Sequence, residues 1–176
     1  MSSVSQAVWG FLATDGSLPN ARSALTNLKV NGSSTPVIFY YEAPAGQGVR
    51  LNRINGVLDS SDECEADYFA GGASVLTNGL KFQLRDPSDN VSQLSPLIKS
   101  NIDFCFLAGT DVGHANFTAR VDREVLVFKW TLSKGFADGA PMLPPGWRFE
   151  VVVQDDLTAA GWDIDNFDFY LQGSIA

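Results

Sequence analysis

The chain has 176 residues, the usual length of one domain. Hydrophobic residues make up 45% and charged residues 18% of the chain, and this balance excludes an intrinsically disordered protein. The 20 acidic residues outnumber the 12 basic ones, and the net charge of −8 provides no electrostatic attraction to nucleic acid or to anionic lipid. We therefore expect neither a nucleic-acid partner nor a membrane partner.

The first 35 residues are rich in turn formers and show no sustained helical or strand period, although residues 21–30 could form a short helix. We interpret residues 1–35 as an extended N-terminal arm that precedes a domain of residues 36–176. The arm contains a small apolar group, which could either pack into its own domain or reach a neighbouring subunit. This group is the candidate partner-binding site, and it consists of Val8, Trp9, Phe11 and Leu12.

From residue 37 onward, short stretches of β-branched, aromatic and alternating residues are typical of strands. They predict strands at residues 37–41, 49–58, 80–84, 102–106, 125–132, 149–153 and 167–171. The alternation in the second stretch changes phase at Arg53 and Ile54, and this change predicts a β-bulge. Both faces of the stretch at 125–132 are apolar, which indicates a central strand.

The intervening segments are predicted as turns and loops, apart from one helical turn at 60–68. Loops are expected at 85–96 and 109–116, and the proline-rich stretch 135–146 is expected to form neither helix nor ladder. About seven or eight short strands without a sustained helix predict an all-β chain, namely an antiparallel β-sandwich or jelly roll.

No catalytic motif accompanies the single histidine, His114. One histidine excludes a multi-histidine metal site within one chain, and a Ser-His-Asp triad would have to use it without a G-x-S-x-G turn nearby. We expect His114 to be a loop residue without a catalytic role. Cys64 and Cys105 are interpreted as two buried free thiols, although a disulfide between them stays open.

Two further groups of residues could bind a ligand. Four aspartates could form a calcium site, although a solvated acidic loop that caps its own backbone is the simpler interpretation. These aspartates are Asp155, Asp156, Asp163 and Asp165. Trp147 and Trp162 lie beside loops and could contact a sugar. We expect no catalytic residue, metal or cofactor, and binding or assembly is the favoured class of function.

Three groups of residues follow one another in a distinctive order. They are FYYEAPAG at 39–46 with VRLNRI at 49–54, LTNGL at 76–80 with PLIKSN at 96–101, and QDDLT at 154–158 before a last strand that ends in LQG at 171–173. In this order they resemble a family of small virion structural proteins of tailed bacteriophages, over residues 36–173. The resemblance implies a β-sandwich or jelly-roll virion component without catalytic residues. Capsid-decorating cement proteins of this kind typically form trimers at the junctions between capsomers.

The expectation is therefore a capsid decoration protein that binds the major capsid protein and stabilises the shell. It would be a homo-oligomer, most simply a trimer, on the capsid surface of the virion after assembly in the host cytoplasm. The start of the chain has no basic segment followed by an apolar run, so we expect no secretory signal. The alternative is a carbohydrate-binding or receptor-binding module of a phage tail, or a free lectin. The motifs leave the choice between head and tail open.

Overall fold

The structure is a computed structural model that describes residues 7–11, 13–15, 31–60, 76–95, 97, 99, 115–117, 125–132, 140–156 and 164–175. Every secondary-structure element named within these ranges is a β-strand, and every strand pair is antiparallel. The predicted all-β, antiparallel fold class is thus confirmed. The helices predicted at 21–30 and 60–68 and the strand at 102–106 lie largely or wholly outside the described residues.

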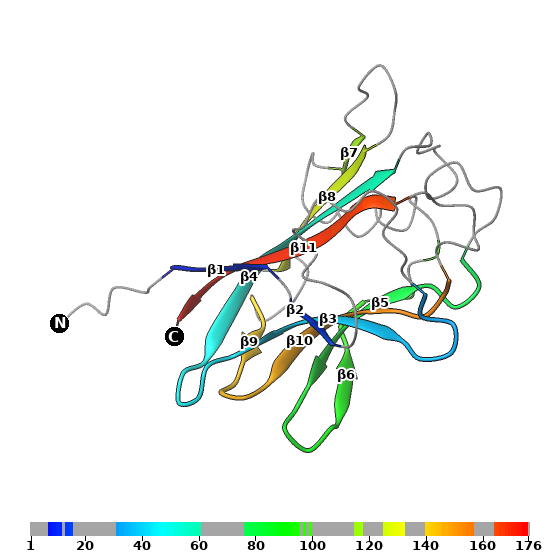
Figure 1. Ribbon diagram of the computed structural model, residues 1–176. Helices are drawn as coiled ribbons and strands as arrows, with labels where there is room; N and C mark the ends of the chain where they lie inside the picture. The colour runs from blue at the N-terminus through cyan, green and yellow to red at the C-terminus, as the bar shows by residue number, and fades with distance from the viewer. Residues whose placement is uncertain are drawn as a thin grey trace.

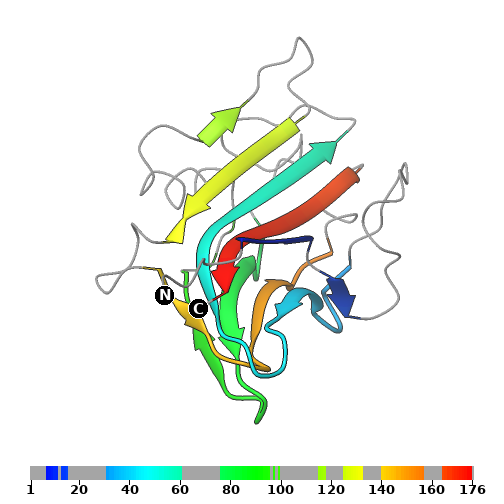
Figure 2. The ribbon, with the colours of Figure 1, turned by 90° about the vertical axis from the view of Figure 1, so that its left-hand side faces the viewer.

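The described strands form two sheets, which Figures 1 and 2 show as two layers. Sheet A has the order β1 (Ala7–Phe11), β11 (Ile164–Ile175), β4 (Val49–Ser60), β8 (Val125–Thr131) and β7 (Ala115–Phe117), and β9 (Met142–Leu143) pairs with the start of β4. Sheet B has the order β2 (Ala13–Asp15), β3 (Val37–Glu42), β10 (Arg148–Val153), β5 (Leu80–Arg85) and β6 (Val91–Gln93).

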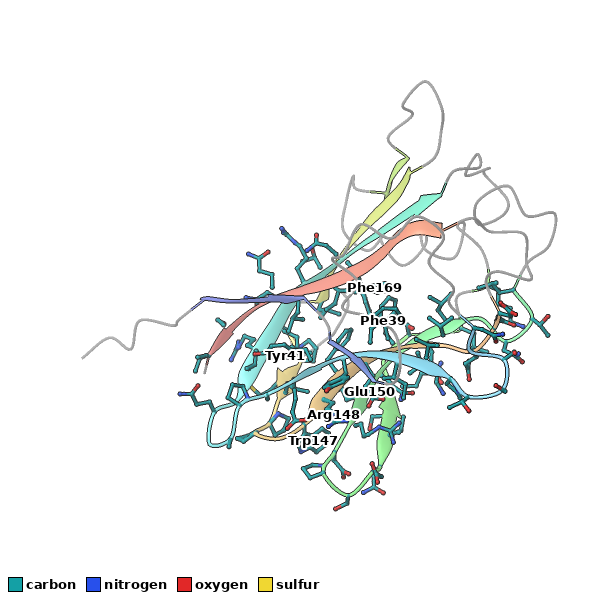
Figure 3. The ribbon with its side chains drawn as sticks, in the orientation of Figure 1. Phe39, Tyr41, Trp147, Arg148, Glu150 and Phe169 are labelled. Carbon is teal, nitrogen blue, oxygen red and sulfur yellow. The ribbon has the colours of Figure 1, made fainter. Side chains whose placement is uncertain are left out.

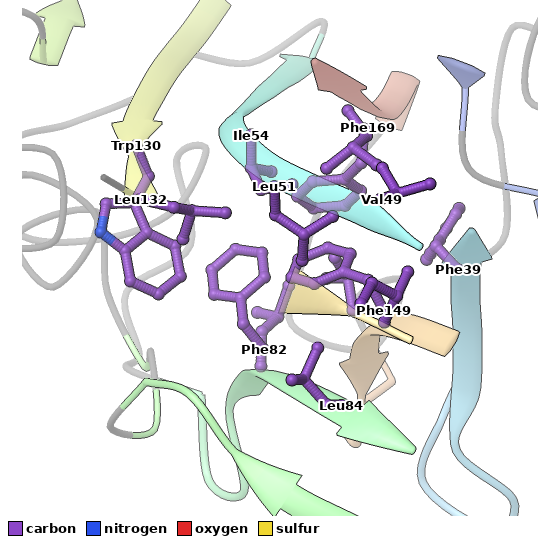
Figure 4. Packing of buried hydrophobic residues seen from close by; sticks show 14 of the residues in the cluster. Phe39, Val49, Leu51, Ile54, Phe82, Leu84, Trp130, Leu132, Phe149 and Phe169 are labelled. Atoms are coloured by element: carbon purple, nitrogen blue, oxygen red, sulfur yellow. The ribbon is translucent and has the colours of Figure 1, made fainter. Parts of the chain in front are cut away.

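The hydrophobic core lies between the two sheets, so the architecture is a β-sandwich (Figure 4). Phe39 of sheet B meets Phe169 of sheet A with ring centroids 5.6 Å apart, and Phe82 of sheet B meets Trp130 of sheet A at 5.5 Å. Phe82 also stacks on Phe149 of its own sheet at 6.1 Å. Aromatic pairs at these distances add to the burial energy of each ring, and they tie the two layers together.

The predicted bulge is confirmed in β4. Across the β4–β11 pair, Gln172 lies opposite Arg53 but Gly173 lies opposite Leu51, so Asn52 is an extra residue. Leu51 and Ile54 can therefore both be fully buried although they are three positions apart. The bulge also marks the point where β4 changes its other neighbour, from β8 to β9.

Five short strands differ from the sequence expectations. Residues 1–35 were expected to be poor in strands, yet they contain β1 and β2. Residues 91–93 pair as β6, wholly inside the loop predicted at 85–96, and residues 115–117 pair as β7, mostly inside the loop predicted at 109–116. The stretch 135–146 was expected to form no ladder, yet β9 pairs with Val49 and Arg50. The prediction for β9 was wrong because Pro141 and Pro144 flank the paired residues rather than interrupt them.

The finer parts of the fold prediction are not confirmed. The strand order does not establish a jelly roll. The described residues of the expected N-terminal arm lie on the body of the molecule, where β1 pairs with β11 and β2 pairs with β3. Backbone pairing in two sheets differs from the extended arm that the turn-rich composition predicted.

Candidate functional site

The predicted partner-binding residues lie at one margin of the sandwich. Val8 lies opposite Gly173, Trp9 opposite Gln172 and Phe11 opposite Tyr170 in the β1–β11 pair. Leu12 lies outside the described residues, between β1 and β2. Since only this residue separates the two strands, residues 7–15 cross directly from the edge of sheet A to the edge of sheet B (Figure 1).

The register divides these residues between two faces of sheet A. Directly opposed residues in an antiparallel pair share one face, and successive residues alternate. Phe169 and Leu171 of β11 are buried in the core, so the positions of Tyr170 and Gln172 belong to the outer face. Trp9 and Phe11 occupy outer-face positions, whereas Val8 occupies a core-face position. The structure thus brings two of the four candidates together on one face.

Both sheets end in short strands at this margin. Within the described part of the chain, β1 has β11 as its single neighbour, and β2 has β3 as its single neighbour. We call residues 7–15, which contain these two outermost strands, the β1–β2 edge. An edge strand presents unpaired N–H and C=O groups along one side, where another chain can add a strand. The β1–β2 edge is therefore the candidate interaction surface.

The chain is firmly attached to the body where the described residues resume at Asn31. The Asn31 side chain donates a 2.7 Å hydrogen bond to Asp156, and the Gly32 amide donates a 2.8 Å hydrogen bond to the carbonyl of Asp155. Gly32 is buried, and a Cβ atom there would lie 2.1 Å from the carbonyl oxygen of Val153. Only glycine allows this close approach of two backbones.

Asp155, one of the four candidate calcium ligands, satisfies backbone groups instead. Its carboxylate accepts a 2.6 Å hydrogen bond from the Gly79 amide and two 3.1 Å hydrogen bonds from the Asn78 amide. Asp155 therefore caps backbone groups, but it differs from the predicted solvated loop, because it is buried and caps the distant turn that precedes β5 rather than its own loop. Among the described residues, no group of three or more His, Cys, Asp or Glu side chains is placed to hold a metal.

The other candidate ligand residues are placed only in part. Asp156 accepts the hydrogen bond from Asn31, and Asp165 belongs to β11. Trp147 is half-buried against the core at one end of the sandwich (Figure 3). Its backbone amide donates a hydrogen bond to the carbonyl of Pro144, and its carbonyl accepts one from the amide of Ala43. The remaining candidates lie outside the described residues: Cys64, Cys105, His114, Trp162 and Asp163.

A polar cluster on the outer face of sheet B was not predicted from the sequence. Its centre is Glu150 of β10, which is 1% exposed although Phe149 and Val151 beside it face the core (Figure 3). Gln83 Nε2 donates a 2.5 Å hydrogen bond to Glu150 Oε2, and Arg85 Nε donates a 2.7 Å hydrogen bond to Glu150 Oε1. The hydrogen bond to Glu150 raises the pKa of Arg85 above its ordinary value.

A second ion pair extends this cluster toward β3. Arg148 lies directly opposite Arg85, an arrangement of like charges that is unfavourable by itself. Arg148 is balanced by a 2.8 Å hydrogen bond to Glu42, and its guanidinium lies 4.4 Å from the ring centroid of Tyr40. The alternation within each strand predicts which of its residues share a face. Only the pairing of β10 with β3 and β5 shows that the residues of this cluster are neighbours.

Comparisons were made with protein families, curated proteins and solved structures. None of the three found a match to this chain. Within the described residues, no helix is long and apolar enough to cross a membrane.

Proposed function

We propose that this chain is a capsid decoration protein of a tailed bacteriophage, which binds the major capsid protein and stabilises the shell. The observation that carries the proposal is the β1–β2 edge. It ends both sheets of the sandwich at one margin, and it contains the residues that the sequence marks for partner contact. The order of motifs along residues 36–173 supports the same class of protein.

The physical properties of this edge suit a binding role. Open strand edges can pair with a segment of another protein through backbone hydrogen bonds. Trp9 and Phe11 share the outer face there, and aromatic residues commonly carry much of the energy of protein interfaces. A modest contact repeated on a symmetric shell gains strength from multivalency, particularly if the protein is a trimer.

The test is co-sedimentation of the purified protein with expanded shells of its own phage. Replacing Trp9 and Phe11 together by alanine should weaken shell binding by roughly tenfold or more, because both positions lie on the outer face of the β1–β2 edge. The control is Val91→Ala, which changes a 46% exposed residue on β6 at the opposite side of sheet B. Equal binding by the double variant and the control would exclude this edge as the docking site.

The alternative, a glycan-binding module, would act through Trp147 and Trp162. A glycan array screened with and without calcium tests it directly. Binding to a defined glycan that is lost in Trp147→Ala, together with no binding to shells, would replace the capsid proposal.

A further inference from the structure

The β1–β2 edge also has the properties of an exchangeable element. We propose that residues 7–15 of one copy of this chain can occupy the same two edge positions, along β11 and β3, in a second copy. The two copies would then share sheets A and B. This proposal concerns copies of the chain alone and does not depend on the capsid function.

The first argument is the nature of the attachment. β1 contacts the body through its pairing with β11, and β2 through its pairing with β3. Both are terminal strands in the order of their sheets, and they follow each other in the chain. A contiguous segment that forms the outermost strand of each sheet can leave without breaking any pairing among the other described strands.

The second argument is that the rest of the chain, the body, has a hydrophobic core of its own. The buried hydrophobic residues that the structure describes all lie between Phe39 and Leu171, and they come from the strands and turns of both sheets. The body begins firmly at Asn31 and Gly32, which are hydrogen bonded to Asp156 and Asp155. The body therefore has both a core and a point of attachment for the chain that do not lie within residues 7–15.

The third argument is reach. Residues 16–30 connect the segment to the body, and these 15 residues can span up to about 50 Å. A compact domain of 176 residues has a radius of gyration of about 16 Å, or a diameter of about 40 Å. The connection is long enough for residues 7–15 to reach either their own body or that of an adjacent copy.

The balance between the two arrangements follows from concentration. Both arrangements make the same strand pairs, so neither is favoured by its contacts. A tether of this length gives the chain's own segment an effective concentration on the order of millimolar. Exchange should therefore be slight in dilute solution. It should increase when the concentration of copies approaches the effective concentration of the tethered segment.

The experiment uses engineered cysteines at register partners. Ala7 lies opposite Ser174, and opposed residues in an antiparallel pair have Cα atoms about 4.5–5.5 Å apart, within the range of a disulfide. One full-length chain carries Ala7→Cys, and another carries Ser174→Cys. The two are incubated together at up to millimolar concentration and oxidised, and peptide mass spectrometry identifies the 7–174 link, with Cys64 and Cys105 left in place.

Two controls make the result decisive. A chain that carries both substitutions should form the link within itself in dilute solution, which verifies the β1–β11 register. A mixture of Ala7→Cys with Tyr170→Cys is out of register by four positions, which is too far to bridge. We expect the in-register mixture to give about tenfold more cross-chain disulfide than the out-of-register mixture. The yield of the in-register disulfide should increase with protein concentration.

The proposal fails if the doubly substituted chain links internally while the in-register mixture never exceeds the out-of-register control. It also fails if the doubly substituted chain forms no 7–174 link, because β1 would then not lie on β11. Thermal unfolding of each variant verifies that it is folded. The first failure leaves the shell-binding test unaffected, since that test is independent of exchange, whereas the second would also remove the edge on which the proposed function rests.

Discussion

Glu150 is a buried carboxylate on the outer face of sheet B, and it depends on its neighbours. It is 1% exposed, whereas the side chain of Arg85 is 25% exposed. Loss of either partner should therefore have unequal consequences. A guanidinium that loses Glu150 can still be hydrated, but a carboxylate that loses Arg85 stays buried beside Gln83 without its counter-charge.

We predict that Arg85→Met destabilises the protein by about 3–5 kcal/mol, because it leaves a buried charge unpaired. Glu150→Gln should cost about 1–2 kcal/mol, since it exchanges a charged hydrogen bond for a neutral one. The measurement is urea unfolding followed by tryptophan fluorescence. Glu42→Gln is the surface control, at about 0–1 kcal/mol, because the Glu42 side chain is 47% exposed. A larger cost for Glu150→Gln than for Arg85→Met would contradict this account.

Asp155 provides a second prediction at the level of a single residue. Asp155→Ala should cost about 2–3 kcal/mol, because the Asn78 and Gly79 amides lose a charged acceptor at a largely buried site. Asp156→Ala is the matched control next in sequence. Its hydrogen bond from Asn31 is exposed, and chemical denaturation should show a cost below about 1 kcal/mol. Equal losses would indicate that the Asp155 cap contributes little.

At the scale of an element, the β5–β6 hairpin is held by Asp86. Its side chain accepts hydrogen bonds from the Asn90 side chain at 2.8 Å, the Asn90 amide at 2.9 Å and the Ser88 amide at 2.8 Å. These bonds, with the Asn90 side chain first, lower the pKa of Asp86 below its ordinary value. The stabilisation is therefore complete above the unfolded pKa of about 4 and is lost as pH falls through the lower, folded pKa.

We expect the Ser88 and Asn90 amide resonances to titrate in NMR spectra with a midpoint below the ordinary pKa of an aspartate, because the hydrogen bonds lower the pKa of Asp86. Asp86→Asn should abolish that titration. A midpoint at or above the ordinary value would show that these hydrogen bonds do not favour the charged carboxylate.

Strand β1 is the second element with a direct test. Deletion of residues 1–12 removes β1 and exposes the edge of β11, which should lower Tm by about 2–4 °C for each kcal/mol of stability lost. It should also increase aggregation, because β11 gains an unpaired edge. Deletion of residues 1–6 retains β1 and should leave both properties unchanged. Thermal unfolding with light scattering compares the two, and identical curves would mean that β1 contributes nothing.

The elements differ in how far the sequence could predict them. The strands that contain Phe39, Phe82 and Phe149 were predicted because alternation is local. The bulge at Asn52 was predicted for the same reason, since the phase change at Arg53 is visible in the chain. Strands β1, β2 and β9 were missed because short, glycine-containing or proline-flanked segments become strands only when a distant partner is present.

The candidate site was predicted in part for similar reasons. The apolar group around Trp9 and Phe11 was recognisable from composition, but its pairing with β11 requires contacts across most of the chain. The cluster around Glu150 could not be predicted. Alternation assigns Arg148 and Glu150 to one face, but it does not identify Gln83 and Arg85 as their neighbours.

For the whole molecule, Phe82 is the residue through which the two sheets act as one unit. It contacts Phe149 in sheet B and both Trp130 and Phe169 in sheet A. Phe82→Ala should therefore cost about 3–5 kcal/mol, with one cooperative transition retained. Calorimetry and urea unfolding measure both quantities. Val91→Ala is the exposed control and should be close to neutral; two separate transitions in Phe82→Ala would mean that the sheets unfold independently.

The extra residue in β4 determines where this strand can tolerate the deletion of a single residue. If the codon for Asn52 were deleted, Val49, Leu51 and Ile54 would alternate strictly with Arg50 and Arg53, and the core face would keep its apolar side chains. A one-codon deletion elsewhere within the strand would instead shift every residue beyond it to the other face. Asn52 is thus a position at which β4 can lose one residue while its apolar side chains stay on the core face. The deletion would remove the bulge, and with it the bend at which β4 changes its neighbour from β8 to β9.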